Sequence, residues 1–293
     1  MAIAQRLRRD GLALVGVRVV SLLVCLGPAN LVLRARMVDT LGRNPLADPE
    51  QPVLHATLVL QALRAIPASW VVLAVVGGLS FVVWDQILTA AALIRLDPRQ
   101  RQPVGLGRQL WGDAGRHLWP MLRIVGVSLI GLVVTTILVA KVIGHFDTRA
   151  AAEGWTGQAR FAGLRSIQAA ATVVATVLIG SWTWLAKALT VSGRRRVVRR
   201  TLIDAARVWW RVIGSWVLPF AVVTLAAQGL GVVLLSSSYP PTGSVGATAA
   251  WWAYLLVHAT VWAWVAWAAG RALSAEDRRR FGPDREDRSA ATR

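Results

Sequence analysis

The chain has 293 residues, 55% of them hydrophobic, and a formal net charge of +18 at pH 7. Its mean hydropathy of +0.50 means more apolar surface than a soluble fold of this length could bury, which excludes an ordinary soluble protein. The positive charge would suggest a nucleic-acid partner in a soluble protein, but here the basic clusters border apolar segments. No nucleic-acid binding is therefore predicted.

Six apolar segments follow one another along the chain, each long enough for the roughly 20 residues that cross a hydrocarbon core. They are Leu12–Leu33, Pro67–Ile94, Met121–Ile143, Ile167–Leu189, Val212–Leu235 and Ala247–Leu273. The sequence predicts an all-α, polytopic transmembrane helix bundle of six spans within residues 1–274. Residues 275–293 are predicted to form a charged, disordered cytoplasmic tail.

The first apolar segment also resembles a signal peptide, because Arg6, Arg8 and Arg9 precede it. It is too long for that role. Arg18 interrupts it, and Arg34 follows where small cleavage-site residues would be expected. A retained first span is therefore favoured.

The distribution of basic residues predicts the orientation. With the N-terminus inside, 23 arginines lie in cytoplasmic segments and seven in external ones. This positive-inside bias predicts that both termini are cytoplasmic. The basic residues are 31 Arg and 2 Lys, a bias typical of a GC-rich genome, so we expect a multi-pass protein of a bacterial cytoplasmic (inner) membrane.

The first external loop, Arg34–Ile66, is the longest. Its Asn, Pro and Asp residues break regular structure before an apolar face appears, from Val53 to Ala65. This face predicts a helix that lies on the outer membrane surface before the second span.

Two cytoplasmic connectors have the periodicity of amphipathic helices. Apolar residues recur every three or four positions in both, at Leu106, Leu110, Ala114, Leu118 and Leu122 in the first and at Val198, Leu202, Ala205, Trp209 and Val212 in the second. Arginines suited to anionic headgroups accompany them: Arg108, Arg116, Arg199, Arg200, Arg207 and Arg211. We predict two interfacial helices that contact anionic lipids on the cytoplasmic face.

The two connectors also share a motif. Asp113, Ala114, Arg116 and Trp119 recur 91 positions later as Asp204, Ala205, Arg207 and Trp210, so Asp-Ala-x-Arg-x-x-Trp precedes the third span and the fifth. This layout resembles the membrane domain attached to some glycerophosphodiester phosphodiesterases, and it is similar to stand-alone bacterial six-helix membrane proteins of unknown function. The phosphodiesterase chemistry of such fusions belongs to a separate soluble barrel, and no segment here is long and polar enough to form one. The resemblance therefore implies no catalytic residue.

Polar residues within the spans are the candidate site, because a charge at depth costs at least about 2.5 kcal/mol. Asp85 and Lys187 each lie near the cytoplasmic end of a span, where they would either pair or reach the interface independently. His258 lies near the middle of the sixth span, as a neutral hydrogen-bonded residue or as a proton relay. Arg18 either lies two turns inside the first span or marks where its buried part begins.

No cofactor, metal or catalytic residue is predicted. Cys25 is the only cysteine, and the four histidines are divided between the two sides and the bilayer. The fifteen tryptophans map mainly near the two surfaces, as aromatic belts do, although an aromatic cage for a quaternary ammonium headgroup is an alternative. We expect a non-enzymatic, lipid-contacting or accessory membrane protein, with a small secondary transporter or permease-like protein as the alternative.

Overall fold

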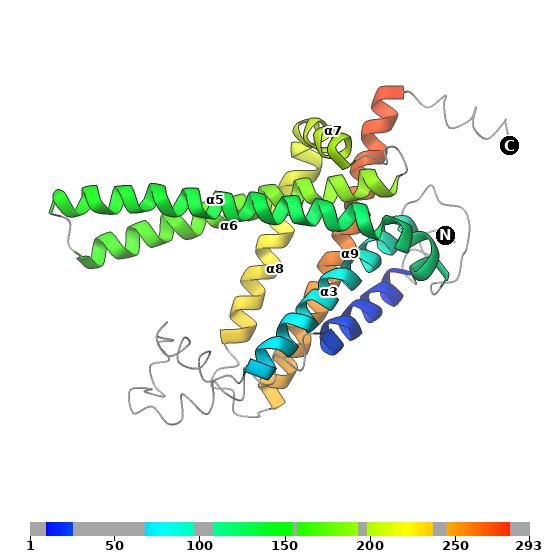
Figure 1. Cartoon of the computed structure of the whole chain (residues 1–293), viewed down its shortest axis with the longest axis horizontal. Helices are drawn as coiled ribbons and strands as arrows, with labels where there is room; N and C mark the ends of the chain where they lie inside the picture. The colour runs from blue at the N-terminus through cyan, green and yellow to red at the C-terminus, as the bar shows by residue number, and fades with distance from the viewer. Residues whose placement is uncertain are drawn as a thin grey trace. The chain divides into compact units, whose positions relative to one another are not determined.

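The structure, a computed structural model, describes residues 10–25, 68–96, 108–154, 157–192, 198–236 and 245–281. Throughout these ranges the chain is helical or forms the turn at the end of a helix. The all-α fold predicted from the sequence is therefore confirmed for the described residues, which form seven α-helices (Figure 1).

Five helices are long and apolar enough to cross a membrane, and they coincide with five of the six predicted spans. They are α3 (Ala68–Arg95), α5 (Leu118–Ala152), α6 (Gly157–Val191), α8 (Leu218–Ser236) and α9 (Val245–Phe281). The chain is an integral membrane protein of the multi-pass, helical type. Of the first predicted span, residues 10–25 are helical. Residues 26–33 and the predicted outer helix of Arg34–Ile66 lie outside the described residues.

The chain divides into two compact units. Unit 1 comprises residues 1–96 and 225–264, and unit 2 comprises residues 97–224 and 265–293. The N-terminal helix of residues 10–25, drawn in blue in Figure 1, and α3 belong to unit 1, whereas α5, α6 and α7 (Val198–Arg211) belong to unit 2. α9 contributes to both units and continues to Phe281, past the predicted start of the tail at residue 275.

α5 and α6 form an antiparallel hairpin in unit 2 and run side by side (Figure 1). Each has 35 residues, about 50 Å of helix, which exceeds the roughly 30 Å of a hydrocarbon core. A hydrogen bond of 2.7 Å joins the hydroxyls of Ser128 on α5 and Thr183 on α6. Much of the remaining surface of the pair is exposed and apolar, as the lipid-facing side of a membrane protein is.

The first connector differs from the predicted regular amphipathic helix. It forms a π-helical turn, η1 (Gln109–Ala114), and a 3₁₀ turn, η2 (Gly115–His117), which lead directly into α5. Pro120 has no backbone N–H for the carbonyl four residues earlier, so regular α-helical bonding is interrupted at this point.

The second connector is a separate helix. α7 ends at Arg211 and is followed by a π-helical turn, η3 (Ile213–Val217), that leads into α8. Pro219 lacks the N–H that would bond to the carbonyl of Ser215 within η3, which again accounts for the irregular turn. The chain thereby changes direction between α7 and the span that follows.

Candidate intramembrane polar site and cytoplasmic basic helix

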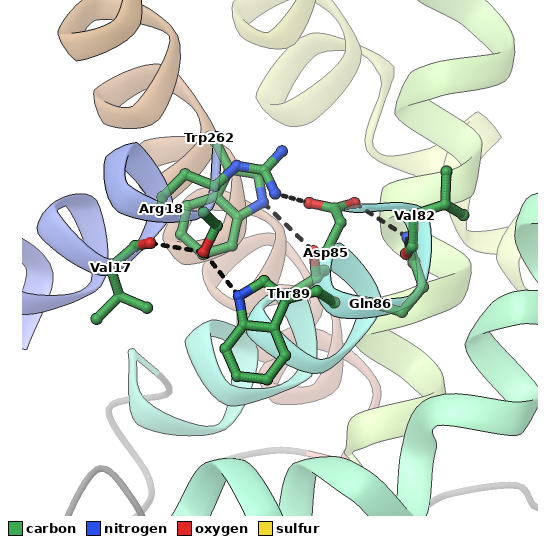
Figure 2. A network of polar contacts seen from close by, with 9 residues as sticks. Val17, Arg18, Val82, Asp85, Gln86, Thr89 and Trp262 are labelled. Carbon is green, nitrogen blue, oxygen red and sulfur yellow. Dashed lines mark hydrogen bonds and ion pairs between the residues drawn. The ribbon is translucent and has the colours of Figure 1, made fainter. Parts of the chain in front are cut away.

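A buried ion pair joins the N-terminal helix of residues 10–25 to α3 in unit 1. Arg18 of the N-terminal helix donates from Nη1 to Oδ1 of Asp85 on α3 (Figure 2). Only 5% of the Arg18 side chain and 19% of the Asp85 side chain are exposed. Arg18 is therefore buried among the helices of unit 1, and where the lipid-buried part of the first span begins stays a prediction.

Aromatic rings enclose the Arg18 guanidinium. Its central carbon lies 4.7 Å from the ring centre of Phe81 on α3 and 5.0 Å from that of Trp262 on α9. Both distances are within cation–π range, and such contacts gain strength when the cation is desolvated. Trp262 also donates from Nε1 to the hydroxyl of Thr89, at 3.3 Å. Three helices of unit 1 thus converge on one arginine (Figure 2).

The second oxygen of Asp85 is also bonded. Gln86 donates from Nε2 to Oδ2 of Asp85, at 3.0 Å, and to the carbonyl of Val82, at 3.2 Å. Both carboxylate oxygens therefore have donors from unit 1. A carboxylate has about four acceptor positions, so these two donors fill about half of them and leave neither oxygen without a partner.

A second ion pair joins the same two helices with the charges exchanged. Arg95 of α3 donates from Nη2 to Oδ1 of Asp10, at 2.9 Å. The N-terminal helix thus contributes Asp10 and Arg18, and α3 contributes Arg95 and Asp85. Because each helix carries one charge of each sign, a shift of one helix along the other would bring like charges together. The two pairs select one antiparallel register.

His258 lies on α9, one helical turn before Trp262, whose ring contacts the Arg18 guanidinium. Three buried polar atoms of unit 1 lack hydrogen-bond partners among the described residues. They are Nδ1 of His258, Nε of Arg18 and Oε1 of Gln86. Orphaned buried polar atoms commonly bind water or a small polar group. Unit 1 therefore combines an ion pair and a histidine with unused hydrogen-bonding capacity.

The sequence pointed to part of this site. Asp85 and His258, both predicted, belong to unit 1 together with Arg18, whereas Lys187 belongs to unit 2. There Lys187 is buried, 6% exposed, with Nζ 5.4 Å from the ring centre of Trp184. The pairing of Asp85 with Lys187 stays a prediction. Sequence reasoning missed the roles of Asp10, Gln86 and Arg18, although Arg18 and Asp85 lie at comparable distances from the cytoplasmic ends of adjacent spans.

The second candidate site is α7, which is amphipathic as predicted. Thr201, Ala205 and Val208 are buried on one side. The opposite side is exposed and carries the arginines predicted to contact lipid, Arg199, Arg200, Arg207 and Arg211, together with Ile203 and Trp210. The structure therefore separates a face that packs on the protein from a face that is open to its surroundings.

The adjacent tryptophans of α7 have different environments, although the sequence places both near the inner surface. Trp209 donates from Nε1 to the hydroxyl of Ser181 on α6, at 2.8 Å, and Trp182 of α6 donates to the carbonyl of Leu202, at 3.3 Å. Trp210 is 70% exposed. The apolar stripe predicted from Val198 to Val212 thus packs on α6, and Trp210 alone of this tryptophan pair is directed outward.

The Ala, Arg and Trp of the repeated motif have the same pattern of burial in both copies. Ala114 and Ala205 are fully buried, whereas Trp119 is 63% exposed and Trp210 is 70% exposed. The arginines of the motif, Arg116 and Arg207, are exposed in both copies as well. The alanine is small enough for close packing, and the Arg and Trp are the side chains that an interface with headgroups favours.

Comparisons with known proteins return no match. No family model, characterised protein or solved structure shows significant similarity to this chain. The resemblance to the membrane domain of glycerophosphodiester phosphodiesterases, drawn from the layout of the sequence, stays a prediction.

Proposed function

We propose that this chain is a non-enzymatic membrane protein of the bacterial cytoplasmic membrane that binds anionic lipid headgroups on its cytoplasmic face. The outward face of α7 carries the proposal, because four arginines stand there beside exposed Ile203 and Trp210, which are 46% and 70% exposed. The other face of the helix packs on α6. The outward face is thus the one available to lipid.

The composition of this face fits the boundary between hydrocarbon and headgroups. An arginine near an anionic membrane surface contributes about 1 kcal/mol, and an indole favours the headgroup level. The first connector adds exposed Arg108 and Arg116 with Trp111, 74% exposed, and Trp119. Two segments of unit 2 thus carry the same pair of side-chain types.

Two of the arginines are also engaged within the protein. Arg211 donates from Nη1 to Oε1 of Glu276, at 3.3 Å, and Arg207 lies 4.0 Å from Asp204. Arg207 is 73% exposed in its side chain and Arg211 57%, so both still reach solvent. We expect Arg199 and Arg200 to contribute most to lipid binding.

The test uses the full chain, because an isolated α7 peptide would also expose the stripe that packs on α6. The purified protein is equilibrated with mixed anionic and zwitterionic lipids, and the lipids that co-purify are counted by native mass spectrometry. Replacing Arg199, Arg200, Arg207 and Arg211 with Gln should remove most of the enrichment in anionic lipid. The matched control replaces the same residues with Lys and should retain it. Equal enrichment in the Gln variant would contradict the proposal.

The orientation on which this proposal depends has its own test. Reporter fusions should be cytoplasmic after Arg101, Arg196 and Arg288, and external after Asp48, Gly157 and Thr242. A cytoplasmic reporter at Thr242 would contradict the arrangement of six spans.

A small secondary transporter is the alternative, and the buried cluster of Arg18, Asp85 and His258 favours it. Intramembrane ionisable residues commonly line the routes of ions or substrates. Proteoliposomes under an imposed pH gradient provide the test. A proton flux that requires Asp85 and His258 would support the transporter. A flux no greater than that of protein-free liposomes would leave the cluster with a structural role.

A further inference from the structure

An apolar cavity of about 660 Å³ opens between α5 and α6 at the end of the hairpin that is predicted to be external. Its walls include Leu138, Val142 and Phe146 from α5 and Leu164, Ile167 and Ala171 from α6. Arg149 and Glu153 of α5 also border it. The cavity thus has hydrocarbon walls and two opposite charges at its border.

We propose that this cavity, hereafter the hairpin groove, binds one acyl chain of a zwitterionic glycerophospholipid. The Arg149–Glu153 pair receives the headgroup. This lipid differs from the anionic lipid proposed for α7. The two sites lie at opposite ends of the hairpin, since α7 contacts α6 around Ser181 and the groove involves Leu164 to Ala171.

The size and the walls of the hairpin groove suit an acyl chain. Binding sites for small molecules measure roughly 300–1,000 Å³, and the groove falls within this range. The groove is open on one side, so an apolar group can enter it, and its apolar walls offer water few hydrogen-bond partners. In a bilayer the chains of neighbouring lipids are the apolar groups at hand. Phe146, 51% exposed, and Ile167, 57% exposed, offer contact surface to such a chain.

The hairpin groove crosses the predicted outer edge of the hydrocarbon core. The predicted spans end at Ile143 on α5 and begin at Ile167 on α6. At 1.5 Å per residue, Leu138 and Ala171 lie about 6–8 Å inside this edge and Arg149 lies about 9 Å outside it. A lipid of the outer leaflet would therefore have its headgroup at the level of Arg149 and the first part of one acyl chain beside Leu138 and Ala171.

The charges at the border select the headgroup. Nε of Arg149 lies 3.8 Å from Oε1 of Glu153, and the side chains are 70% and 58% exposed. A guanidinium is a strong partner for phosphate, and a carboxylate accepts hydrogen bonds from an ammonium. A zwitterionic headgroup with both groups can therefore bind both residues. An anionic headgroup would bring negative charge close to Glu153.

The test uses the full chain in bilayers that contain a phosphatidylethanolamine probe with a photoreactive diazirine in its acyl chain. After illumination, mass spectrometry of the digested protein shows which peptides carry the probe. We expect adducts to concentrate at Leu138–Phe146 and Leu164–Ala171.

Ala171→Phe, which fills the groove, should remove most of them. Ile167→Trp is a second filling variant at a side chain that is already exposed. Val133→Phe is the matched control, because Val133 is 55% exposed on α5 outside the groove lining.

The headgroup is tested by comparing this probe with an anionic phosphatidylglycerol probe. Arg149→Gln should lower phosphatidylethanolamine adducts roughly two- to fivefold, as for one exposed charge contact. Glu153→Gln should shift the preference toward phosphatidylglycerol. Adducts spread evenly over the exposed side of α5, or adducts that Ala171→Phe and Ile167→Trp leave unchanged, would overturn the proposal. Because the α7 arginines are intact in every groove variant, this result is independent of the proposed function.

Discussion

The two units of the chain share indole–hydroxyl contacts between helices and differ in their buried ion pairs. In unit 1 two ion pairs, Arg18 to Asp85 and Arg95 to Asp10, join the N-terminal helix to α3, in addition to the indole–hydroxyl bonds of Trp84 to Ser21 and of Trp262 to Thr89. In unit 2 the contacts of α6 with α5, α7 and η3 use indoles and hydroxyls. Ser181 accepts from Trp209 at its hydroxyl, at 2.8 Å, and from Trp216 at its carbonyl, at 3.1 Å.

The difference determines how each unit should respond to substitution. A charge within a membrane protein is costly unless it is paired, so each member of an ion pair depends on the other. An indole supplies a large apolar surface and one donor, and its loss leaves a space and an unused acceptor but no charge. We expect damage to be larger and more strongly coupled in unit 1 than in unit 2.

The largest effect is expected at the buried ion pair. Arg18→Gln or Asp85→Asn alone leaves an uncompensated buried charge and should lower the free energy of unfolding by about 3–5 kcal/mol. The double variant should lose much less than the sum of the single losses, because no orphaned charge remains. Unfolding in mixed micelles of SDS and a mild detergent measures these free energies.

Glu153→Gln is the control for this prediction, because its pair with Arg149 is exposed and should contribute at most about 1 kcal/mol. Additive losses from Arg18→Gln and Asp85→Asn would remove the distinction between the two units.

A smaller effect is expected in unit 2. Trp216 is fully buried, and Trp216→Phe removes both volume and the donor to the Ser181 carbonyl. The free energy of unfolding should fall by about 1–3 kcal/mol. Trp210→Phe is the control at a side chain that is 70% exposed, and it should change stability by less than about 0.5 kcal/mol. Equal losses would show that the exposed tryptophan packs against another part of the protein.

Two adjacent glycines of α3 test how closely the N-terminal helix approaches α3. A Cβ at Gly77 would lie 2.5 Å from the backbone carbonyl oxygen of Cys25, which cannot move aside easily, whereas a Cβ at Gly78 meets no described atom within 4 Å. Gly77→Ala should therefore lower the free energy of unfolding by about 1–3 kcal/mol. Gly78→Ala should raise it by about 0.5–1 kcal/mol, because alanine favours the helix. The reverse order would mean that the N-terminal helix does not approach α3 at Gly77.

Hydropathy and length were sufficient to predict most of the fold. Five apolar segments correspond to helices because apolar residues in lipid must satisfy their backbone hydrogen bonds locally. The helix ends were less predictable, since α5 continues to Ala152 and α9 to Phe281 into polar sequence that hydropathy assigns to loops or a tail. Periodicity predicted α7. The π-helical turns depend on Pro120 and Pro219 within particular hydrogen-bond patterns, which periodicity does not detect.

The candidate site was predictable only as a set of polar residues. Sequence depth placed Asp85 and His258 within the membrane, but which helices pack together decides which charges meet. The sequence shows Arg18 as a charged residue within a span, but it does not show which residue pairs with it. The tryptophans show the same limit. Trp209 and Trp210 are adjacent in sequence, yet one donates to Ser181 and the other is exposed, because successive helix positions point about 100° apart.

The smallest effect concerns the pair of Asp85 with Lys187 that the sequence suggested, and it tests whether the units are coupled by charge. Oδ1 of Asp85 accepts from Arg18 and Oδ2 from Gln86, so a lysine would be a third donor on a carboxylate whose charge is already paired and whose two oxygens each have a donor. We therefore expect the losses from Asp85→Asn and Lys187→Gln to add within about 0.5 kcal/mol in a double-mutant cycle. The cycle of Asp85→Asn with Arg18→Gln, measured in the same micelles, provides the reference coupling energy for a pair in direct contact. A coupling energy for Asp85 and Lys187 well above 0.5 kcal/mol, the additivity limit for independent sites, would show that a charge of unit 2 reaches the site of unit 1. The ion pairs of unit 1 would then not be independent of the charges of unit 2.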